Sequence, residues 1–324
     1  MMRWIPLVVV GALLLMLPFA DAAMANSWLF RASTLVILTI SWNMMANAGL
    51  VSLGHAAFWG VGSYIGILTV NMAGVPFFVA LVPAMIGGAG LGVVLAIATA
   101  RLRGIYFAMS TLALSEGLRV VALMVPFVTG GASGIYIDKN AVPSAVLLPL
   151  FALLGAFASI ALSAYLVRTR FHFASRALRN SEDAAKMLGV DPRRYRANVM
   201  ALSGALAAAA GCLNASYSGY LDPETAFSLN YTILPQISAI IGGVHTVAGP
   251  VLGAIFIMVL MEVTRFASGA TPGIGLMILG ILLIVCILYL PRGIHGMITH
   301  SIVLRHALTR RAQPESSNKA SAAP

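Results

Sequence analysis

The chain has 324 residues, of which 60% are hydrophobic and only 9% are charged, and its mean hydropathy is +0.92. This composition excludes an ordinary soluble domain and indicates an all-α polytopic membrane protein. The formal net charge of +10 does not point to a nucleic-acid partner, because basic residues at the ends of apolar segments are what membrane insertion produces.

Apolar segments of about 20 residues, long enough to cross a bilayer, recur along the chain. They lie near residues 4–20, 28–48, 55–72, 76–100, 104–125, 145–167, 197–216, 248–264 and 272–290. A weaker segment at 225–243 contains Pro235 and ends at Gly242 and Gly243, which predicts a broken or re-entrant helix packed inside protein. We therefore expect about ten transmembrane helices in one membrane domain over residues 1–300. The Ser- and Ala-rich tail, 301–324, is expected to be disordered and cytoplasmic.

The first segment has two interpretations. Arg3 precedes it and Ala23 to Ala25, the small-residue sequence Ala-Met-Ala, follow it, as in a secretory signal with its cleavage site. A retained first helix is preferred, and removing it would not change the orientation of the later segments.

The longest polar interval is residues 168–196, with eight Lys or Arg against three acids. Within it Ser181 is a helix cap, Glu182 and Asp183 favour the N-terminal turn, and Gly189 and Pro192 are stop signals. The pattern predicts about two helical turns that show Ala184, Ala185 and Leu188 along one side. The interval is either a basic loop that only orients the protein or a docking element for a cytoplasmic partner.

Orientation follows from the distribution of charge. The loops near 126–144 and 217–230 have no basic surplus, so they belong outside. The linker with Arg101 and Arg103, the 168–196 interval and the tail belong inside, which places both termini in the cytoplasm. Two arginines fall on the wrong side of this scheme. Arg265 has Glu262 one turn earlier as a partner, whereas nothing in the sequence accounts for Arg31.

Polar residues inside apolar segments are candidates for a transport pathway, because ionisable groups are costly there. His55, at the start of the third segment, is either a ligand or gate residue or a hydrogen-bonded packing residue. Glu116 and Arg119, three residues apart, are either a proton-coupling carboxylate with its partner or an internal ion pair.

A glycine-rich run follows on the outer side, from Thr129 through Gly130 and Gly131 to Gly134. Its backbone amides would suit a substrate entrance or a contact with a carboxylate, but a plain flexible loop explains it equally well. Small-xxx-small pairs that allow close helix approach occur at Gly62/Gly66, Gly88/Gly92 and Gly249/Gly253.

Enzyme motifs are missing from the sequence. None of its three lysines follows a glycine, so the chain cannot supply the phosphate-binding loop of an ATPase. It has no HExxH or GxSxG motif and no clustered His and Cys, so neither catalysis, a metal nor a cofactor is expected. Cys212 and Cys286 lie in apolar segments and read as small core residues.

Six stretches together resemble the LivM-type permease of branched-chain amino acid ABC importers. They occur in that family's order: SLGHAAFWGVGSY (52–64), RLRGIYFAMSTLALSE (101–116), TGGASGI (129–135), RALRNSEDAAKMLGVDPRRYR (176–196), IGGVHTVAGPVLGA (241–254) and LPRG (290–293). The family usually has Gly-Leu-Gly-Ser where this chain has Gly243-Val244-His245-Thr246, so His245 is a departure.

The resemblance implies an inner-membrane subunit that forms half of a translocation pathway. Its partners would be a homologous LivH-type permease, two cytoplasmic ABC ATPases and a periplasmic substrate-binding protein. Residues 168–196 would be the coupling loop, with Arg179, Glu182, Asp183, Ala184, Leu188 and Gly189 at the ATPase. Leucine, isoleucine and valine are the default solutes, and urea, short amides and carboxylic acids stay open. The alternative is an autonomous proton-coupled transporter with Glu116 or Glu262 as the proton carrier.

Overall fold

The computed structural model describes residues 23–138 and 146–267, with isolated positions between 277 and 294. The segment 4–20, nearly all of 272–290, the tail and Cys286 lie outside the described residues. The described elements are α2 (Ala23–Asn47), α3 (His55–Ala73), α4 (Phe77–Ala98), α5 (Ile105–Met124), α6 (Pro126–Thr129), the 3₁₀ turn η2 (Gly131–Ser133), β1 (Ile135–Tyr136), α7 (Leu147–Val167), α8 (Arg170–Asn180), α9 (Glu182–Met187), α10 (Pro192–Ser218), β2 (Tyr220–Leu221), α11 (Pro223–Ala226), α12 (Asn230–Gly242) and α13 (Ala248–Ala267).

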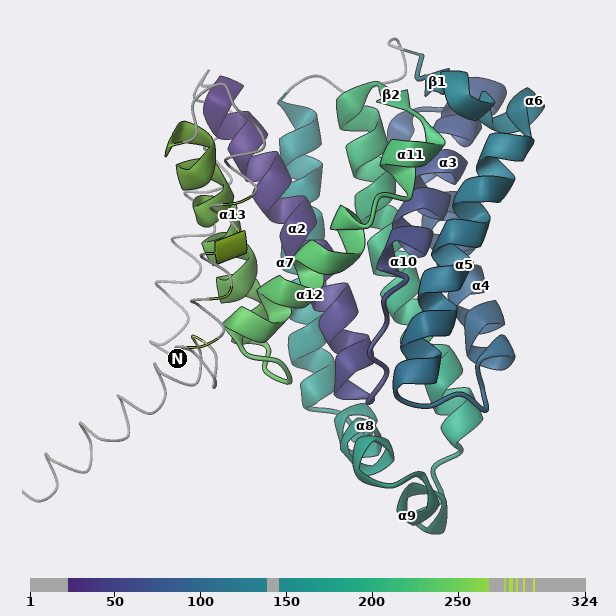
Figure 1. The fold of residues 1–324 in the computed structure, drawn as a ribbon, viewed down its shortest axis with the longest axis vertical. Coiled ribbons are helices and arrows are strands. Elements are labelled where there is room, and N and C mark those ends of the chain that lie inside the picture. The colour runs from purple at the N-terminus through teal and green to yellow at the C-terminus, as the bar shows by residue number, and fades with distance from the viewer. Residues whose placement is uncertain are drawn as a thin grey trace, which may run out of the picture.

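Seven of the described helices are long and apolar enough to cross a membrane: α2, α3, α4, α5, α7, α10 and α13. Each corresponds to a predicted apolar segment. They stand roughly side by side, with α8 and α9 projecting from one end of the bundle (Figure 1). The chain is thus an all-α polytopic membrane protein, as its composition predicts.

Helix α10 is the centre of the bundle because glycines let α3 and α4 pack directly on its backbone. A methyl group at Gly62 of α3 would overlap the backbone of Ala208, and one at Gly92 of α4 would overlap the backbone of Met200. Gly253 of α13 meets the Ser238 carbonyl of α12 in the same way. The three predicted small-residue pairs therefore mark true helix contacts.

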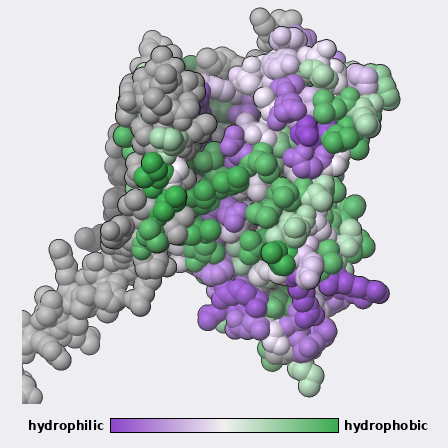
Figure 2. Space-filling model, in the orientation of Figure 1, coloured by the Kyte–Doolittle hydropathy of each residue, from purple (hydrophilic) through white to green (hydrophobic). Residues whose placement is uncertain are grey.

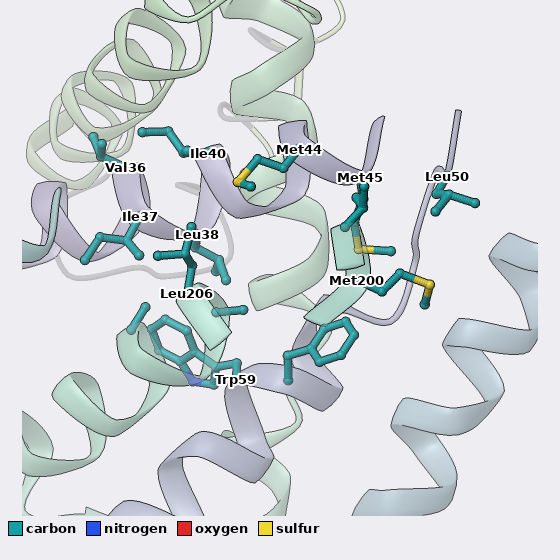
Figure 3. Packing of buried hydrophobic residues seen from close by; sticks show 14 of the residues in the cluster. Val36, Ile37, Leu38, Ile40, Met44, Met45, Leu50, Trp59, Met200 and Leu206 are labelled. Carbon is teal, nitrogen blue, oxygen red and sulfur yellow. The ribbon is translucent and has the colours of Figure 1, made fainter. Parts of the chain in front are cut away.

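Apolar side chains fill the space that remains around this contact. Figure 3 shows buried side chains on both sides of α2: Leu38 lies on the side of Leu206 and Trp59 and Met45 lies beside Met200, whereas Val36 and Ile40 point the other way. All of these side chains are buried. This cluster fixes α2 against the central helix.

A seven-residue interruption separates α2 from α3, where the sequence predicts a gap between the segments 28–48 and 55–72, but its course inside the bundle was not predicted. Residues 48–54 are not helical and run into the bundle before α3 begins at His55 (Figure 1). The Leu53 amide donates to Thr111 Oγ1 at 3.0 Å, the Trp42 indole donates to the Ser52 carbonyl at 2.9 Å, and the Ala56 amide donates to Thr232 Oγ1 at 3.0 Å. Irregular backbone at membrane depth is tolerated where protein supplies hydrogen bonds in this way.

The weak segment is discontinuous, but not at the predicted place. Helix α12 continues through Pro235, and the break lies between α11 and α12, at residues 227–229. With 13 residues, α12 is roughly 20 Å long, too short to cross a bilayer alone. Pro235 has no backbone N–H, so α12 lacks one helical hydrogen bond at this position. Pro235 is buried, so this gap lies where neighbouring helices pack around α12.

The two ends of the bundle differ in charge as the sequence predicts. At one end β1 pairs with β2 in an antiparallel ribbon, Ile135 opposite Leu221 and Tyr136 opposite Tyr220, so the two loops without a basic surplus meet. At the other end lie α8, α9 and the Arg101–Arg103 linker. Figure 2 shows hydrophilic residues gathered at this lower end, below a mainly hydrophobic middle.

Candidate functional site

The polar end is built from three helices joined by caps. Thr169 caps α8 by accepting from the Phe171 amide at 3.3 Å, and Asp191 caps α10 by accepting from the Arg193 amide at 2.9 Å. Between them, α9 ends at Met187 and is followed by a turn at Gly189, whose φ of +79° is a left-handed conformation that glycine adopts without strain. The short helix and its stop are thus as predicted, whereas α8 was not expected, and Pro192 begins α10 rather than ending a segment.

Glu182 faces the permease itself rather than the surroundings. Its carboxylate accepts from Arg196 at 2.5 Å and also from Arg103, and its side chain is only 13% exposed. Arg196 further donates to the carbonyls of Ala100 and Leu102, both at 3.3 Å. The predicted contact of Glu182 with an ATPase stays a prediction. This residue holds α9 to α10 and to the linker between α4 and α5.

The predicted apolar side of α9 is not a single surface. Ala185 is fully buried in the permease core, whereas Leu188 is 75% exposed and Met187 is 89% exposed. The helix ends at Met187, so Leu188 lies in the following turn and does not continue the line of Ala185. Ala184 lies within α9, and its side chain is outside the described set. Met187 and Leu188 form the exposed apolar tip of the interval, called the α9 tip below.

The remaining predicted coupling residues surround the α9 tip. Asp183 is exposed and accepts from Lys186 at 3.0 Å; this hydrogen bond and the Lys186 charge lower the pKa of the Asp183 carboxyl. Arg179 is exposed in the last turn of α8, where it packs beside Gly49. A groove of about 910 Å³ opens next to α9. Its lining carries five basic residues and two acids: Arg101, Arg103, Lys186, Arg193, Arg196, Glu182 and Asp191.

His55 lies in the bundle interior at the first turn of α3. It is fully buried, its Nε2 is 2.9 Å from Ser41 Oγ, and its ring packs edge-on against Phe58. Ser203 of α10 contributes a second hydroxyl at 3.4 Å. His55 Nδ1 is buried without a partner among the described residues. The side chain therefore ties α2, α3 and α10 together, as a hydrogen-bonded packing histidine would.

Glu116 and Arg119 form the ion pair that their spacing suggests, at 2.8 Å, in the C-terminal half of α5. Arg119 also reaches Glu224 of α11 at 3.0 Å. Glu116 keeps 42% of its side chain exposed and Arg119 keeps 26%. These charges lie on an outer face of this chain rather than in its core.

The glycine-rich run is an ordered turn rather than a flexible loop. The amides of Gly130, Gly131, Ser133 and Gly134 all donate within the turn, the Gly131 amide to Thr129 Oγ1 at 3.2 Å. Gly130, Gly131 and Gly134 have φ values of 72°, 56° and 68°. These four amides are therefore not free, contrary to the expectation. The Thr129 hydroxyl donates to the Val125 carbonyl at 2.8 Å.

His245 occupies a left-handed position with φ 71°, which no other non-glycine residue does in the described part of the chain. This explains why the resembling family has glycine there. The His245 amide donates to Asn43 Oδ1 at 3.1 Å, and its Nδ1 donates to Asn47 Oδ1 at 3.0 Å. Burial and the nearby Arg179 charge lower the pKa of His245. The turn keeps the glycine conformation, with α2 supplying the hydrogen bonds.

A cavity that the sequence did not reveal lies between α2, α10, α12 and α13, in the half of the bundle away from α9. Its volume is about 700 Å³. Three charged residues line it, Arg31 of α2 and Glu262 and Arg265 of α13. The one signal in the sequence was the placement of Arg31 and Arg265 against the charge rule.

Comparison with known proteins agrees with these features. The family model described as branched-chain amino acid transport system / permease component matches residues 24–287. The high-affinity branched-chain amino acid transport system permease protein LivM of Escherichia coli (strain K12) is 27% identical over 168 residues, which cover 52% of this chain and 38% of that protein. The probable branched-chain amino acid transport permease protein LivM of Methanocaldococcus jannaschii is 26% identical over 139 residues, 40% of each chain.

These matches therefore span well under half the length of the curated relatives. No solved structure matches the chain. The family model, in contrast, covers most of the sequence and nearly all of the described helices. The chain belongs to the branched-chain amino acid transport system permease family.

Proposed function

We propose that this chain is the permease subunit of an ATP-driven importer in the cell inner membrane, forming half of the pathway for branched-chain amino acids or related small polar solutes. Its partners are a homologous permease, two cytoplasmic ABC ATPases and a periplasmic binding protein. Membership of the permease family carries the proposal. The chain itself lacks a phosphate-binding loop, so ATP must be hydrolysed by separate subunits.

The α9 tip is the surface that meets an ATPase. Two large apolar side chains, Met187 and Leu188, stand exposed at the end of a short helix outside the bundle. Lys186 and Asp183 flank them, and Glu182 fixes the helix to α10 from behind. A rigidly held, apolar tip with charged flanks is suited to a groove on a partner protein. Under the positive-inside rule, the basic residues at this end support a cytoplasmic location for the α9 tip and for both termini.

The outer half of α5 is the face that meets the second permease or the solute. Only 28% of the apolar window of α5 is buried within this chain. Lipid would not accept the half-exposed Glu116, because intramembrane charges face protein or water. Glu116 and Arg119 are therefore assigned to the pathway side, with α6 and the Thr129–Gly131 turn at its outer end.

Proton-coupled transport is disfavoured by the same contacts. Glu116 is paired with Arg119, and Glu262 is paired with Arg265 one turn away. Neither carboxylate stands free to carry a proton without breaking an ion pair.

Reconstitution tests the proposal. The chain is tagged, purified with the subunits that accompany it and placed in proteoliposomes together with the binding protein. We expect uptake of radiolabelled L-leucine that requires internal ATP and persists with a protonophore. Uptake that ignores ATP and collapses with the protonophore would replace the importer with a secondary transporter.

A further inference from the structure

The charged cavity between α2, α10, α12 and α13 has the composition of a ligand site. It is named here the Arg31 cavity. Residues of α2, α10, α12 and α13 line it; Figure 1 shows where these helices lie in the bundle. Its volume of about 700 Å³ falls within the range of small-molecule sites.

Its charges leave one positive group available. Glu262 is 7% exposed and is held by Arg265, so these two charges offset each other. Arg31 is exposed and forms no ion pair within the described part of the chain. The planar guanidinium binds a carboxylate through two parallel hydrogen bonds. The excess charge of the cavity therefore suits a monoanion.

The rest of the lining is mainly apolar and aromatic. Trp59 and Tyr231 stack at the wall with ring centroids 4.0 Å apart and an interplanar angle of 19°. Side chains suited to an aliphatic group also line it: Leu35, Leu38, Leu234, Met258 and Met261. The ligand should therefore carry an apolar group as well as its charge.

We infer that the Arg31 cavity binds a small monocarboxylate with an aliphatic side chain, its carboxylate on Arg31 and its side chain against the Trp59–Tyr231 wall. The inference deepens the proposed function, because an apolar amino acid also carries a carboxylate and an aliphatic side chain. Its ammonium makes it a zwitterion, so 4-methylpentanoate, which lacks the amine, matches the charge of the cavity more closely. It also explains both departures from the charge rule. Arg31 is kept on the outer side to receive an anion, and Arg265 is kept there to neutralise Glu262.

Direct binding tests this assignment on the assembled complex in nanodiscs of phosphatidylcholine, without the binding protein. The probes are L-leucine, 4-methylpentanoate, which lacks the amine, and 3-methylbutylamine, which lacks the carboxylate. We expect the two carboxylates to bind and the amine not to bind. Arg31→Ala should weaken carboxylate binding about 10- to 100-fold, the range for a lost hydrogen bond to a charged group. Arg31→Lys should weaken it less, and Arg101→Ala, at the opposite end, should change nothing.

Three outcomes would overturn the inference. The first is that neither carboxylate binds the wild type. The second is that both carboxylates bind Arg31→Ala as tightly as they bind the wild type. The third is that phosphatidylglycerol copurifies with the wild type but not with Arg31→Ala while free carboxylates fail, which would make the cavity a lipid site. ATP-dependent uptake with the binding protein is measured on the same preparation. Normal uptake with any of these outcomes would leave the proposed function intact, and loss of wild-type uptake would refute that function separately.

Discussion

Removing the Glu182 carboxylate should release α9 from the bundle. In Glu182→Gln the acceptor of the Arg196 hydrogen bond is no longer a carboxylate. The Glu182 and Arg196 side chains are only 13% and 12% exposed, and a hydrogen bond between charged groups at such a site contributes about 1.5–3 kcal/mol. The Arg103 contact adds at most about 1 kcal/mol, because that guanidinium is 65% exposed. We expect the opening of α9 to become easier by about 2–3 kcal/mol, without loss of the transmembrane fold.

Amide hydrogen exchange of the purified permease measures this change. The amides of Leu188 and Gly189, which bond within the α9 turn, should exchange roughly 30- to 150-fold faster in Glu182→Gln. The matched control is Asp183→Asn, the same chemical change one residue later. Its Lys186 pair is exposed on both sides, so exchange should change by less than about threefold. Equal exchange in the two variants would show that Glu182 does not hold the helix.

Three further changes test the packing, the turn and the orientation. Gly62→Ala should lower stability by about 1–3 kcal/mol through overlap with α10, while Gly90→Ala, which meets open space, should be neutral in thermal denaturation; equal losses would refute the close contact. His245→Gly should be more stable than His245→Ala by about 1–2 kcal/mol, because the left-handed φ of 71° strains alanine but not glycine. The reverse order of stability would be inconsistent with a left-handed turn. A cysteine at Asn180 should react with an impermeant maleimide only from the cytoplasm and one at Ala132 only from the periplasm; the opposite labelling would invert the orientation.

Features that depend on local chemistry were predicted well from the sequence. The apolar segments, the small-residue pairs and the turn at Gly189 that follows α9 each depend on residues near one another in the chain. The charge of the loops also separated the two ends of the bundle correctly, because each loop contributes independently to that pattern.

Features that depend on distant partners were not predicted. The course of residues 48–54 inside the bundle relies on Thr111 and Thr232, which lie on other helices. The sequence alone does not indicate that Glu182 is paired with Arg196, which lies on another helix. The Arg31 cavity requires four helices to be assembled before its charges meet. Helix α8 was not predicted, because a segment with several arginines is typical of a solvated loop.

The central claim, that the α9 tip couples this permease to an ATPase, is tested most directly by Leu188→Asp. Leu188 is 75% exposed in the permease alone, so the substitution should leave insertion and pairing with the second permease unchanged. In a buried contact the unpaired carboxylate would cost on the order of 2–4 kcal/mol. We expect ATP-dependent L-leucine uptake to fall to background, with Leu188→Ala only partly impaired and the binding protein keeping its affinity. Normal uptake by Leu188→Asp would contradict the coupling role and leave residues 168–196 as an orientation signal only.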